Sequence, residues 1–273
     1  MKNLSPILFA FFCMFSAARA VEINERGQVI FKTVESRLVQ YADALSITDI
    51  REDHWQASGD ENAVAAISGT DRLRFYRMMK PGETSPAQYA LGIVKLFPGK
   101  NWVGLWGDPE ENTLKSLFGN RLPEGIVIST GQMEAGASAV EIELPAGSGP
   151  IELPVILRVP AELVTHIPFE KKALCGFRFA GPPQLDKTGL LEGGFTGGDN
   201  PKDSDQLWKY DREKQRAPFA VWYCTKDNTW RLTSPSDFPP VPENYFRYDD
   251  AVTVFSRHPN GIKWGKSGIR ADD

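Results

Sequence analysis

The sequence lacks the histidine and serine patterns of most metal enzymes and hydrolases. Its three histidines, His54, His166 and His258, lie far apart and show neither H-x-x-x-H nor H-E-x-x-H spacing, so we expect no zinc site. The serine motif G-x-S-x-G and the nucleotide-binding motifs G-x-G-x-x-G and G-x-x-x-x-G-K-S/T are also missing. These absences argue against serine hydrolases, zinc peptidases and nucleotide-binding enzymes.

An excess of basic residues is missing as well. Lysine and arginine together number 31 against 35 acidic residues, and the formal net charge is -4. A mildly acidic chain without a basic stripe does not suit nucleic acid or an anionic membrane surface. We therefore expect no nucleic-acid partner.

Only one apolar run is prominent, and it lies at the start of the chain. Lys2 precedes an apolar stretch, residues 7–15, and the small-residue sequence A-R-A ends at Ala20. This is the layout of a secretory signal peptide, and the run is shorter than the roughly 20 apolar residues that a membrane span needs. We expect residues 1–20 to be cleaved, leaving a secreted or periplasmic protein that begins at Val21 and has no membrane span.

Cysteine is scarce. One of the three cysteines, Cys13, belongs to the expected signal peptide, which leaves Cys175 and Cys224. A pair of cysteines in an oxidising compartment is a disulfide candidate, but both residues also lie in apolar runs where a reduced cysteine packs as a small hydrophobic side chain. The sequence leaves both alternatives open, because it cannot place the two Cα atoms. Neither cysteine has a histidine nearby, so we expect no catalytic thiol.

Glycine and proline, by contrast, are plentiful. The 24 glycines and 20 prolines divide the chain into short apolar and aromatic pieces. This pattern is typical of β-sandwich or barrel-like modules, and we predict an all-β, mainly antiparallel fold with short helical turns. The expected organisation after the signal peptide is an N-terminal β-rich segment, residues 21–88, a first β module, 89–168, and a second β module, 169–273.

Local patterns predict two hairpins and a helical turn. Strand-like residues flank the turn sequence PGKN, residues 98–101, and HPNG, residues 258–261, places Asn-Gly where a tight turn requires positive φ. Within residues 108–119, apolar side chains fall at helical spacing ahead of Gly119, which predicts a short helix that packs on a sheet.

Two distant stretches of the chain resemble one another. Residues 100–119 and 172–195 both consist of a strand-like piece, a proline corner and an apolar helical return. Aligning the two lysines that open them also brings Gly104 onto Gly176. Further strand-like pieces follow each stretch, so we predict that a β module is internally duplicated.

The stretch LGIVKLFPGKNWVGLWGDPEENTLKSLFG, residues 91–119, is followed later by DQLWKYD, NTWR, DDAVTVFSR and GIKW. Together these segments resemble a group of secreted β-rich repeat proteins of Gram-negative bacteria, whose repeats carry segments of the type GWNLVGLP, NTL..LFG and DQVYxYD. The resemblance covers roughly residues 88–266 and depends on hydrophobic residues, glycines and tryptophans. It implies an exported β module and no particular chemistry.

The seven tryptophans are the main candidates for ligand contact. Exposed tryptophans can form a platform for sugar rings, whereas buried tryptophans fill cores, which is their more common role. Trp222 and Tyr223 are adjacent in a strand and point to opposite faces, so one of them can be exposed. The candidate ligand-binding residues are Trp222, Tyr223, Trp230 and Asp227, with an extracellular glycan as the ligand.

The loop GGDNPKDSD is rich in side-chain oxygens. Asp199, Asn200, Asp203 and Asp205 are candidate ligands for a calcium ion, the only cofactor that the sequence offers. Their spacing matches no EF-hand, and a solvated turn explains the same residues.

Paired carboxylates are the last catalytic candidates, because acid-base catalysis needs two acids aimed into one cleft. A chain with this many acidic residues contains adjacent or alternate pairs by chance, and here they are Glu110 and Glu111, Glu141 and Glu143, and Asp249 and Asp250.

We therefore expect an exported non-enzymatic β-repeat protein with a structural, adhesive or interaction role in the periplasm or cell envelope, and an envelope protein or glycan as partner. The alternative is a carbohydrate-binding module or a divergent carbohydrate-active hydrolase.

Overall fold

The computed structural model confirms the all-β, mainly antiparallel fold. Strands predominate among the described residues, and no helix there reaches 7 residues. The structure describes residues 21–23, 29–31, 38–44, 50–57, 73–79, 87–109, 117–118, 121–128, 138–160, 162–167, 172–178, 183–216, 220–243, 245–257 and 259–267. The expected signal peptide lies outside these residues. Within them, none of the helices has the length and apolar character that a membrane-spanning helix requires.

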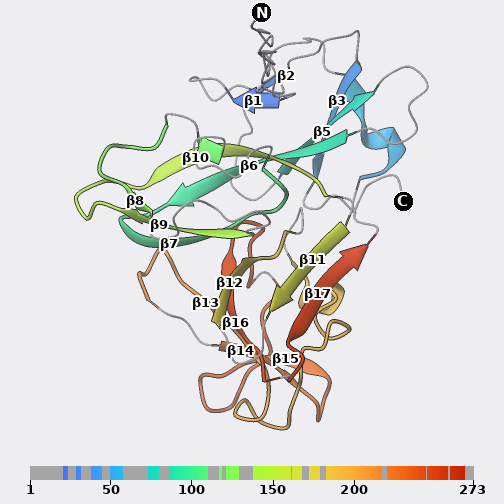
Figure 1. The fold of residues 1–273 in the computed structure, drawn as a ribbon, viewed down its shortest axis with the longest axis vertical. Helices are drawn as coiled ribbons and strands as arrows, with labels where there is room; N and C mark the ends of the chain where they lie inside the picture. Colours follow the sequence, from blue (N-terminus) through green and yellow to red (C-terminus); the bar gives the residue numbers. More distant parts are fainter. Residues whose placement is uncertain are drawn as a thin grey trace, which may run out of the picture.

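The largest sheet of the first half joins the N-terminal segment to the chain that follows it. It lies in the upper part of Figure 1, and its strand order is β10-β6-β5-β3-β4. Its strands are β3 (Leu38–Ala44), β4 (Gln56–Ala57), β5 (Leu73–Met79), β6 (Ala87–Leu96) and β10 (Ile151–Arg158). A separate pair, β1 (Val21–Ile23) and β2 (Val29–Phe31), precedes this sheet, and the 3₁₀ turn η2 (Glu52–His54) precedes β4.

A three-stranded sheet packs against the first one. Its order is β7-β9-β8, with β7 (Gly99–Gly104), β8 (Val127–Ile128) and β9 (Ala139–Leu144). Val103 and Ile142 from this sheet share one core with Leu153, Val155 and Leu157 of β10. The two residues of β10 between these three, Pro154 and Ile156, are half-buried, as strand alternation requires. The two sheets therefore form a sandwich around a common core.

The second half of the chain occupies the lower part of Figure 1. It contains a two-stranded sheet, β11-β17, and a five-stranded sheet of order β12-β16-β13-β14-β15. The strands are β11 (Glu162–Ile167), β12 (Lys172–Gly176), β13 (Gln206–Lys209), β14 (Ala220–Cys224), β15 (Thr229–Leu232), β16 (Ala251–Phe255) and β17 (Ile262–Ser267). Its separate core includes Leu190, Leu207, Val252 and Ile262.

The same order of strand pairing occurs in both halves. In residues 87–158, the first strand, β6, pairs with the last, β10. In the neighbouring sheet β7 pairs with β9, which is the central strand and also pairs with β8. In residues 162–267, the first strand, β11, likewise pairs with the last, β17. In the five-stranded sheet β12 pairs with β16, which pairs on its other side with β13. We name these ranges the first unit and the second unit. The hairpin β14-β15 has no counterpart among the described residues of the first unit.

The boundaries of these units differ from those of the modules that the sequence predicts. The boundary after residue 88 falls inside β6, and β11, placed by the sequence in the first module, pairs with β17 of the second unit. The difference arises because each unit is closed by its first and last strands. Alternation shows which side of a strand faces the core, but it does not identify the partner strand.

Both predicted hairpins are wrong. PGKN joins β6 to β7 and HPNG joins β16 to β17, but each turn carries the chain from one sheet to the other and not to an adjacent strand. The turns themselves have the expected glycine conformation, with φ of 92° at Gly99 and 70° at Gly261. At the first corner, the Asn101 side chain accepts the N–H of Phe97 (2.8 Å) and donates to its carbonyl (2.8 Å), which fixes the corner.

Each unit has a short helical return. Leu117 and Phe118 are helical and buried in the first core. In the second unit, the 3₁₀ helix η3 (Leu185–Lys187) and the turns after it place Leu190 and Phe195 in the second core. The described parts of both returns therefore bury apolar side chains against a sheet.

The two units meet where two glycines let their backbones touch. Gly104 ends β7 and Gly176 ends β12, and an added Cβ would stand less than 3.0 Å from the carbonyl oxygen of Asp250 or Ser138, respectively. Ser138 precedes β9 and Asp250 precedes β16, so each glycine admits the start of a strand from the other unit. The N–H of Gly104 donates to the carbonyl of Asp249 (2.9 Å), and that of Gly176 donates to Ser138 Oγ (3.1 Å).

Tyr248 of the second unit is buried in the core of the first. Its ring packs edge-on against Trp106, with 5.0 Å between ring centroids. Its hydroxyl accepts the N–H of Ile93 (3.0 Å) and donates to the carbonyl of the same residue (2.9 Å). The pairing of β6 with β5 stops at Leu91, so this hydroxyl serves as the partner of the β6 backbone beyond the end of β5. Burial raises the pKa of Tyr248, and the nearby Asp249 carboxylate adds to this shift.

We expect Gly104→Ala and Gly176→Ala each to destabilise the protein, because the added methyl group meets backbone of the other unit. Overpacking of this kind costs about 1–3 kcal/mol, which lowers the melting temperature by roughly 2–4 °C per kcal/mol in a chain of this size. Thermal denaturation measures the effect. Gly147→Ala is the control, because nothing lies within 4 Å of a Cβ at that site. Equal melting temperatures for all three variants would contradict the close junction.

We expect Tyr248→Phe to lower the free energy of unfolding by about 1–3 kcal/mol, because it leaves a buried N–H and carbonyl without their partner while keeping the ring. The midpoint of urea denaturation reports the change. Tyr223→Phe is the matched control, because the Tyr223 hydroxyl lies at the surface and makes only a long contact with Asn228 (3.4 Å). A loss that is no larger in Tyr248→Phe than in this control would show that the hydroxyl does not join the units.

Candidate functional site

The predicted ligand-binding residues all lie on the β14-β15 hairpin, but they face different ways. Tyr223 pairs with Trp230 across the hairpin, and their rings meet edge-to-face at 5.2 Å. Trp222 lies on the other face, only 1% exposed, with its ring edge-on to Phe238. Asp227, in the turn, forms an ion pair with Arg231 at the surface. The structure thus brings Tyr223 and Trp230 together and separates Trp222 from them.

The tryptophans do not form an exposed platform. Five of them are less than 9% exposed: Trp55, Trp106, Trp222, Trp230 and Trp264. Trp102 and Trp208 are half-buried. Trp102 contacts Tyr210 with 5.5 Å between centroids and 42° between ring planes. Core packing, the more common role of tryptophan, therefore accounts for most of the seven.

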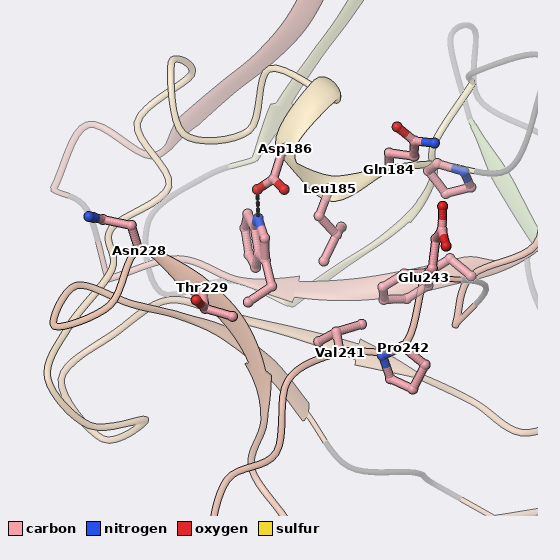
Figure 2. A pocket seen from close by; sticks show the side chains of 11 residues that line it. Gln184, Leu185, Asp186, Asn228, Thr229, Val241, Pro242 and Glu243 are labelled. Atoms are coloured by element: carbon pink, nitrogen blue, oxygen red, sulfur yellow. Dashed lines mark hydrogen bonds between the residues drawn. The ribbon is translucent and has the colours of Figure 1, made fainter.

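A pocket of about 400 Å³ opens beside Trp230. Its size falls in the range of roughly 300–1,000 Å³ that is usual for small-molecule sites. Its walls are residues 183–186 at the start of the helical return, residues 228–230 at the hairpin turn, residues 241–243, and Phe246. Figure 2 shows that these walls come from three separate segments of the second unit.

Two carboxylates reach into this pocket from opposite walls. Asp186 projects from η3 and Glu243 from the segment below it, with the side chain of Leu185 between them (Figure 2). The indole N–H of Trp230 donates to Asp186 Oδ1 (2.8 Å), which holds this carboxylate in place. Both acidic residues are exposed, so the pocket presents negative charge to solvent.

The lower wall is fixed by a chain segment that runs along the outer edge of β15. The N–H of Leu232 donates to the carbonyl of Pro239 (2.9 Å), and the N–H of Val241 donates to the carbonyl of Trp230 (2.9 Å). Residues 239–241 therefore act as a short added strand, and they position Glu243 over the pocket.

Of this pocket, the sequence indicated Trp230 but neither carboxylate. Asp186 follows the proline pair of GPPQLD, and Glu243 follows that of FPPVPE. An acidic residue shortly after a Pro-Pro pair, occurring twice, is the only local signal. It could not show that the two loops meet, because they are joined only through the folded sheet.

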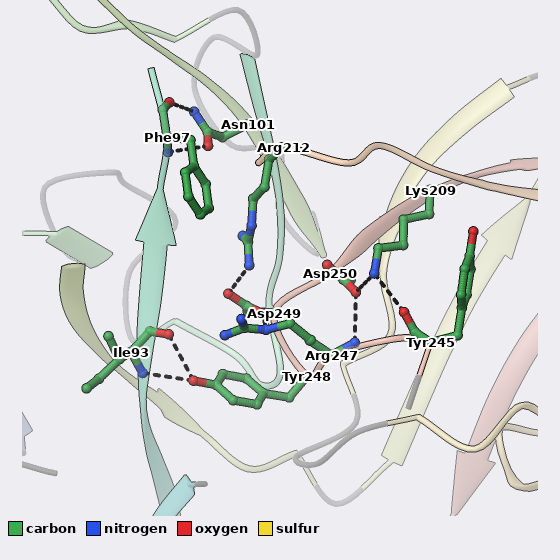
Figure 3. A network of polar contacts seen from close by, with 10 residues as sticks. All are labelled: Ile93, Phe97, Asn101, Lys209, Arg212, Tyr245, Arg247, Tyr248, Asp249 and Asp250. Carbon is green, nitrogen blue, oxygen red and sulfur yellow. Dashed lines mark hydrogen bonds and ion pairs between the residues drawn. The ribbon is translucent and has the colours of Figure 1, made fainter. Parts of the chain in front are cut away.

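The adjacent acids Asp249 and Asp250 serve the junction between the units, as Figure 3 shows. Asp249 is fully buried and forms ion pairs with Arg212 and Arg247. The distance from Arg247 Nε to Asp249 Oδ1 is 3.2 Å. Asp250 accepts the N–H of Arg247 (2.7 Å) and lies 2.6 Å from Lys209 Nζ. Removing one member of a buried ion pair is costly because it leaves the other charge unpaired. These two carboxylates therefore have a structural role.

The other paired acids differ in position. Glu141 accepts the indole N–H of Trp102 and lies 3.2 Å from Lys100 Nζ. Glu143, two residues along β9, is exposed. Glu110 and Glu111 lie outside the described residues. The structure thus brings none of the described pairs into the pocket.

The four oxygen-bearing residues of the proposed calcium loop do not converge. Asp199 accepts the hydroxyl of Thr225 (2.8 Å), and the Asn200 side chain donates to Asp203. Asp205 is buried and caps backbone N–H groups, among them that of Thr196 (2.7 Å). No group of three acidic, histidine or cysteine side chains in the described part of the chain has a metal-binding arrangement. Calcium binding by this loop stays a prediction.

Cys175 and Cys224 are not joined by a disulfide. Cys175 lies on β12 and Cys224 on β14, three strands away in the sheet. At about 4.8 Å per strand this is about 14 Å, whereas a disulfide requires Cα atoms within about 7 Å. Both side chains are buried, and burial raises the pKa of the Cys175 thiol to about 12. Of the two alternatives that the sequence left open, buried reduced cysteines is the one found.

No protein-family model, curated protein or solved structure gives a significant match to this chain. Its function is therefore argued from its own geometry.

We expect the mature chain to show no loss of two hydrogens in its non-reduced intact mass. After denaturation, alkylation should label two thiols, Cys175 and Cys224. In the folded protein the same reagent should react slowly at pH 8, because Cys175 is protonated below its raised pKa and shielded by burial. Rapid labelling of the folded protein would contradict this burial, and a mass two hydrogens lower would show a bridge.

Proposed function

We propose that the chain is an exported, non-enzymatic β-repeat protein with a structural, adhesive or interaction role in the periplasm or cell envelope. The observation that carries this proposal is the junction at Gly104, Gly176 and Tyr248, where the units share backbone contacts and a core. Such a junction restrains the two units relative to one another. Rigid β scaffolds that position surface loops are a common basis for binding.

The use of acidic side chains supports the non-enzymatic part of this proposal. Asp249 and Asp250 neutralise cations at the junction, and Glu141 engages Lys100 and the Trp102 indole. These carboxylates stabilise contacts between strands and loops. They are therefore already committed to holding the scaffold together.

We also propose that the two units arose by duplication, and that the chain is one of the secreted β-rich repeat proteins of Gram-negative bacteria that it resembles. The shared pairing order supports the duplication. So do Gly104 and Gly176, which the sequence aligns and which occupy equivalent places at the ends of β7 and β12.

A second candidate function, carbohydrate binding, is favoured by one aromatic contact between the two units. Trp102 and Tyr210 are both half-buried and in ring contact, beside Glu141 and Lys100. An aromatic pair flanked by charged hydrogen-bonding groups is suited to a sugar ring. This pair differs from the hairpin residues that the sequence indicated.

The main proposal predicts export. Expression in a Gram-negative host should give a protein that begins at Val21 in the periplasmic or envelope fraction, measured by fractionation and N-terminal sequencing. Ala18→Glu, which disrupts the small-residue cleavage motif, should retain the leader. The purified mature protein should sediment with envelope fragments. A full-length wild-type chain in the cytosol would contradict export, and absence from the sedimented envelope would contradict the interaction role.

The second candidate predicts binding to a glycan array that Trp102→Ala abolishes and Trp208→Ala does not. Removing the stacking ring from a sugar site should weaken binding at least about tenfold. Melting temperatures of both variants show whether a loss reflects unfolding. A wild-type protein that binds no glycan would rule out this candidate.

A further inference from the structure

The pocket beside Trp230 has a strong bias in charge. Its described lining includes two carboxylates, Asp186 and Glu243, and no lysine, arginine or histidine. In the described part of the chain, neither carboxylate is in an ion pair. By contrast, the nearby surface acid Asp227 is neutralised by Arg231. Uncompensated negative charge within a concave site attracts cations more strongly than charge on a flat surface.

Asp186 is held in one orientation by a hydrogen bond from an uncharged side chain. The Trp230 indole is a neutral donor that occupies one lone pair of Oδ1 (2.8 Å). The remaining lone pairs of the carboxylate stay available to a ligand. A fixed acceptor costs less ordering entropy on binding than a mobile one.

The faces of Trp230 are not available for stacking on a sugar. Phe195 contacts the ring at 5.1 Å and Tyr223 at 5.2 Å between centroids, and the side chain is only 5% exposed. The rest of the lining combines apolar side chains, Leu185 and Phe246 among them, with the neutral polar residues Gln184, Asn228 and Thr229. The apolar part of the lining can cover a methylene chain, and without an exposed ring face the pocket lacks a platform on which a sugar ring could stack.

We propose that this pocket binds the basic side chain, lysine or arginine, of a partner polypeptide. The aliphatic stem lies over Leu185 and Phe246, and the cationic head lies between Asp186 and Glu243. Long basic side chains bind in this way because they combine an apolar stem with a charged end. This inference rests on the interaction role proposed above and supplies the chemistry of the contact.

Binding of Nα-acetyl-lysine amide, followed by two-dimensional NMR of the mature protein, tests the proposal. Nα-acetyl-norleucine amide has the same stem without the charge and should not bind. Asp186→Asn keeps an oxygen for the Trp230 indole, so the pocket retains its shape. Asp186→Asn and Glu243→Gln should each weaken lysine binding about tenfold, since each removes a charge-assisted hydrogen bond. Added salt should weaken wild-type binding.

Glu213→Gln is the matched control, because it removes one exposed negative charge outside the pocket lining. It should bind like the wild type. Equal binding by the lysine and norleucine probes, or by all three variants, would overturn the proposal. So would binding of glucose or glucosamine without binding of the lysine probe, which would assign the pocket to a carbohydrate.

The same variants separate this inference from the proposed function. If the lysine probe does not bind but the wild type still sediments with envelope fragments, the pocket assignment is overturned and the interaction role stands. If the probe binds as expected, and sedimentation is lost in Asp186→Asn but kept in Glu213→Gln, the pocket is the contact between the protein and its partner.

Discussion

The close approach of two backbones at Gly104 and Gly176 is the constraint on which the rest of the structure depends. Only a residue without a side chain lets the start of a strand from one unit lie against the end of a strand from the other. Once the backbones meet, Tyr248 reaches the core of the first unit and completes the hydrogen bonding of β6 at Ile93. The same segment carries Phe246 into the wall of the pocket. Junction and pocket are thus linked by only a few residues of one continuous chain segment.

The acidic residues fall into two groups with different surroundings. At the junction, Asp249 and Asp250 are buried and paired with arginine and lysine side chains of the same unit, so their charge fixes the segment whose backbone meets Gly104 of the first unit. In the pocket, Asp186 and Glu243 face solvent, and Asp186 is held only by a neutral indole. The second unit therefore has one pair of carboxylates that stabilises the fold and another pair that is available to a ligand. The sequence alone cannot distinguish these groups, because burial decides between them.

Much of the fold could be predicted from the sequence, because strands and turns are encoded locally. Alternation in residues such as Leu153 and Val155 identifies a strand and its buried face, and glycine identifies a turn. Strand partners are not local, which is why PGKN and HPNG suggested hairpins where the chain changes sheets. The sequence left the state of Cys175 and Cys224 open for the same reason, since their separation depends on the order of four strands. The pocket needed three loops to meet, so only Trp230 was identified in advance.

Residues 239–241 also change what the edge of the five-stranded sheet offers to another chain. An uncovered edge strand presents N–H and carbonyl groups to which a strand of another molecule can add. The outer edge of β15 is instead occupied by the chain itself, through Leu232 and Val241. Within this segment, Pro239 and Pro240 have no backbone N–H that could donate to a strand of another molecule. A strand from another molecule could therefore pair with β15 only after displacing this segment.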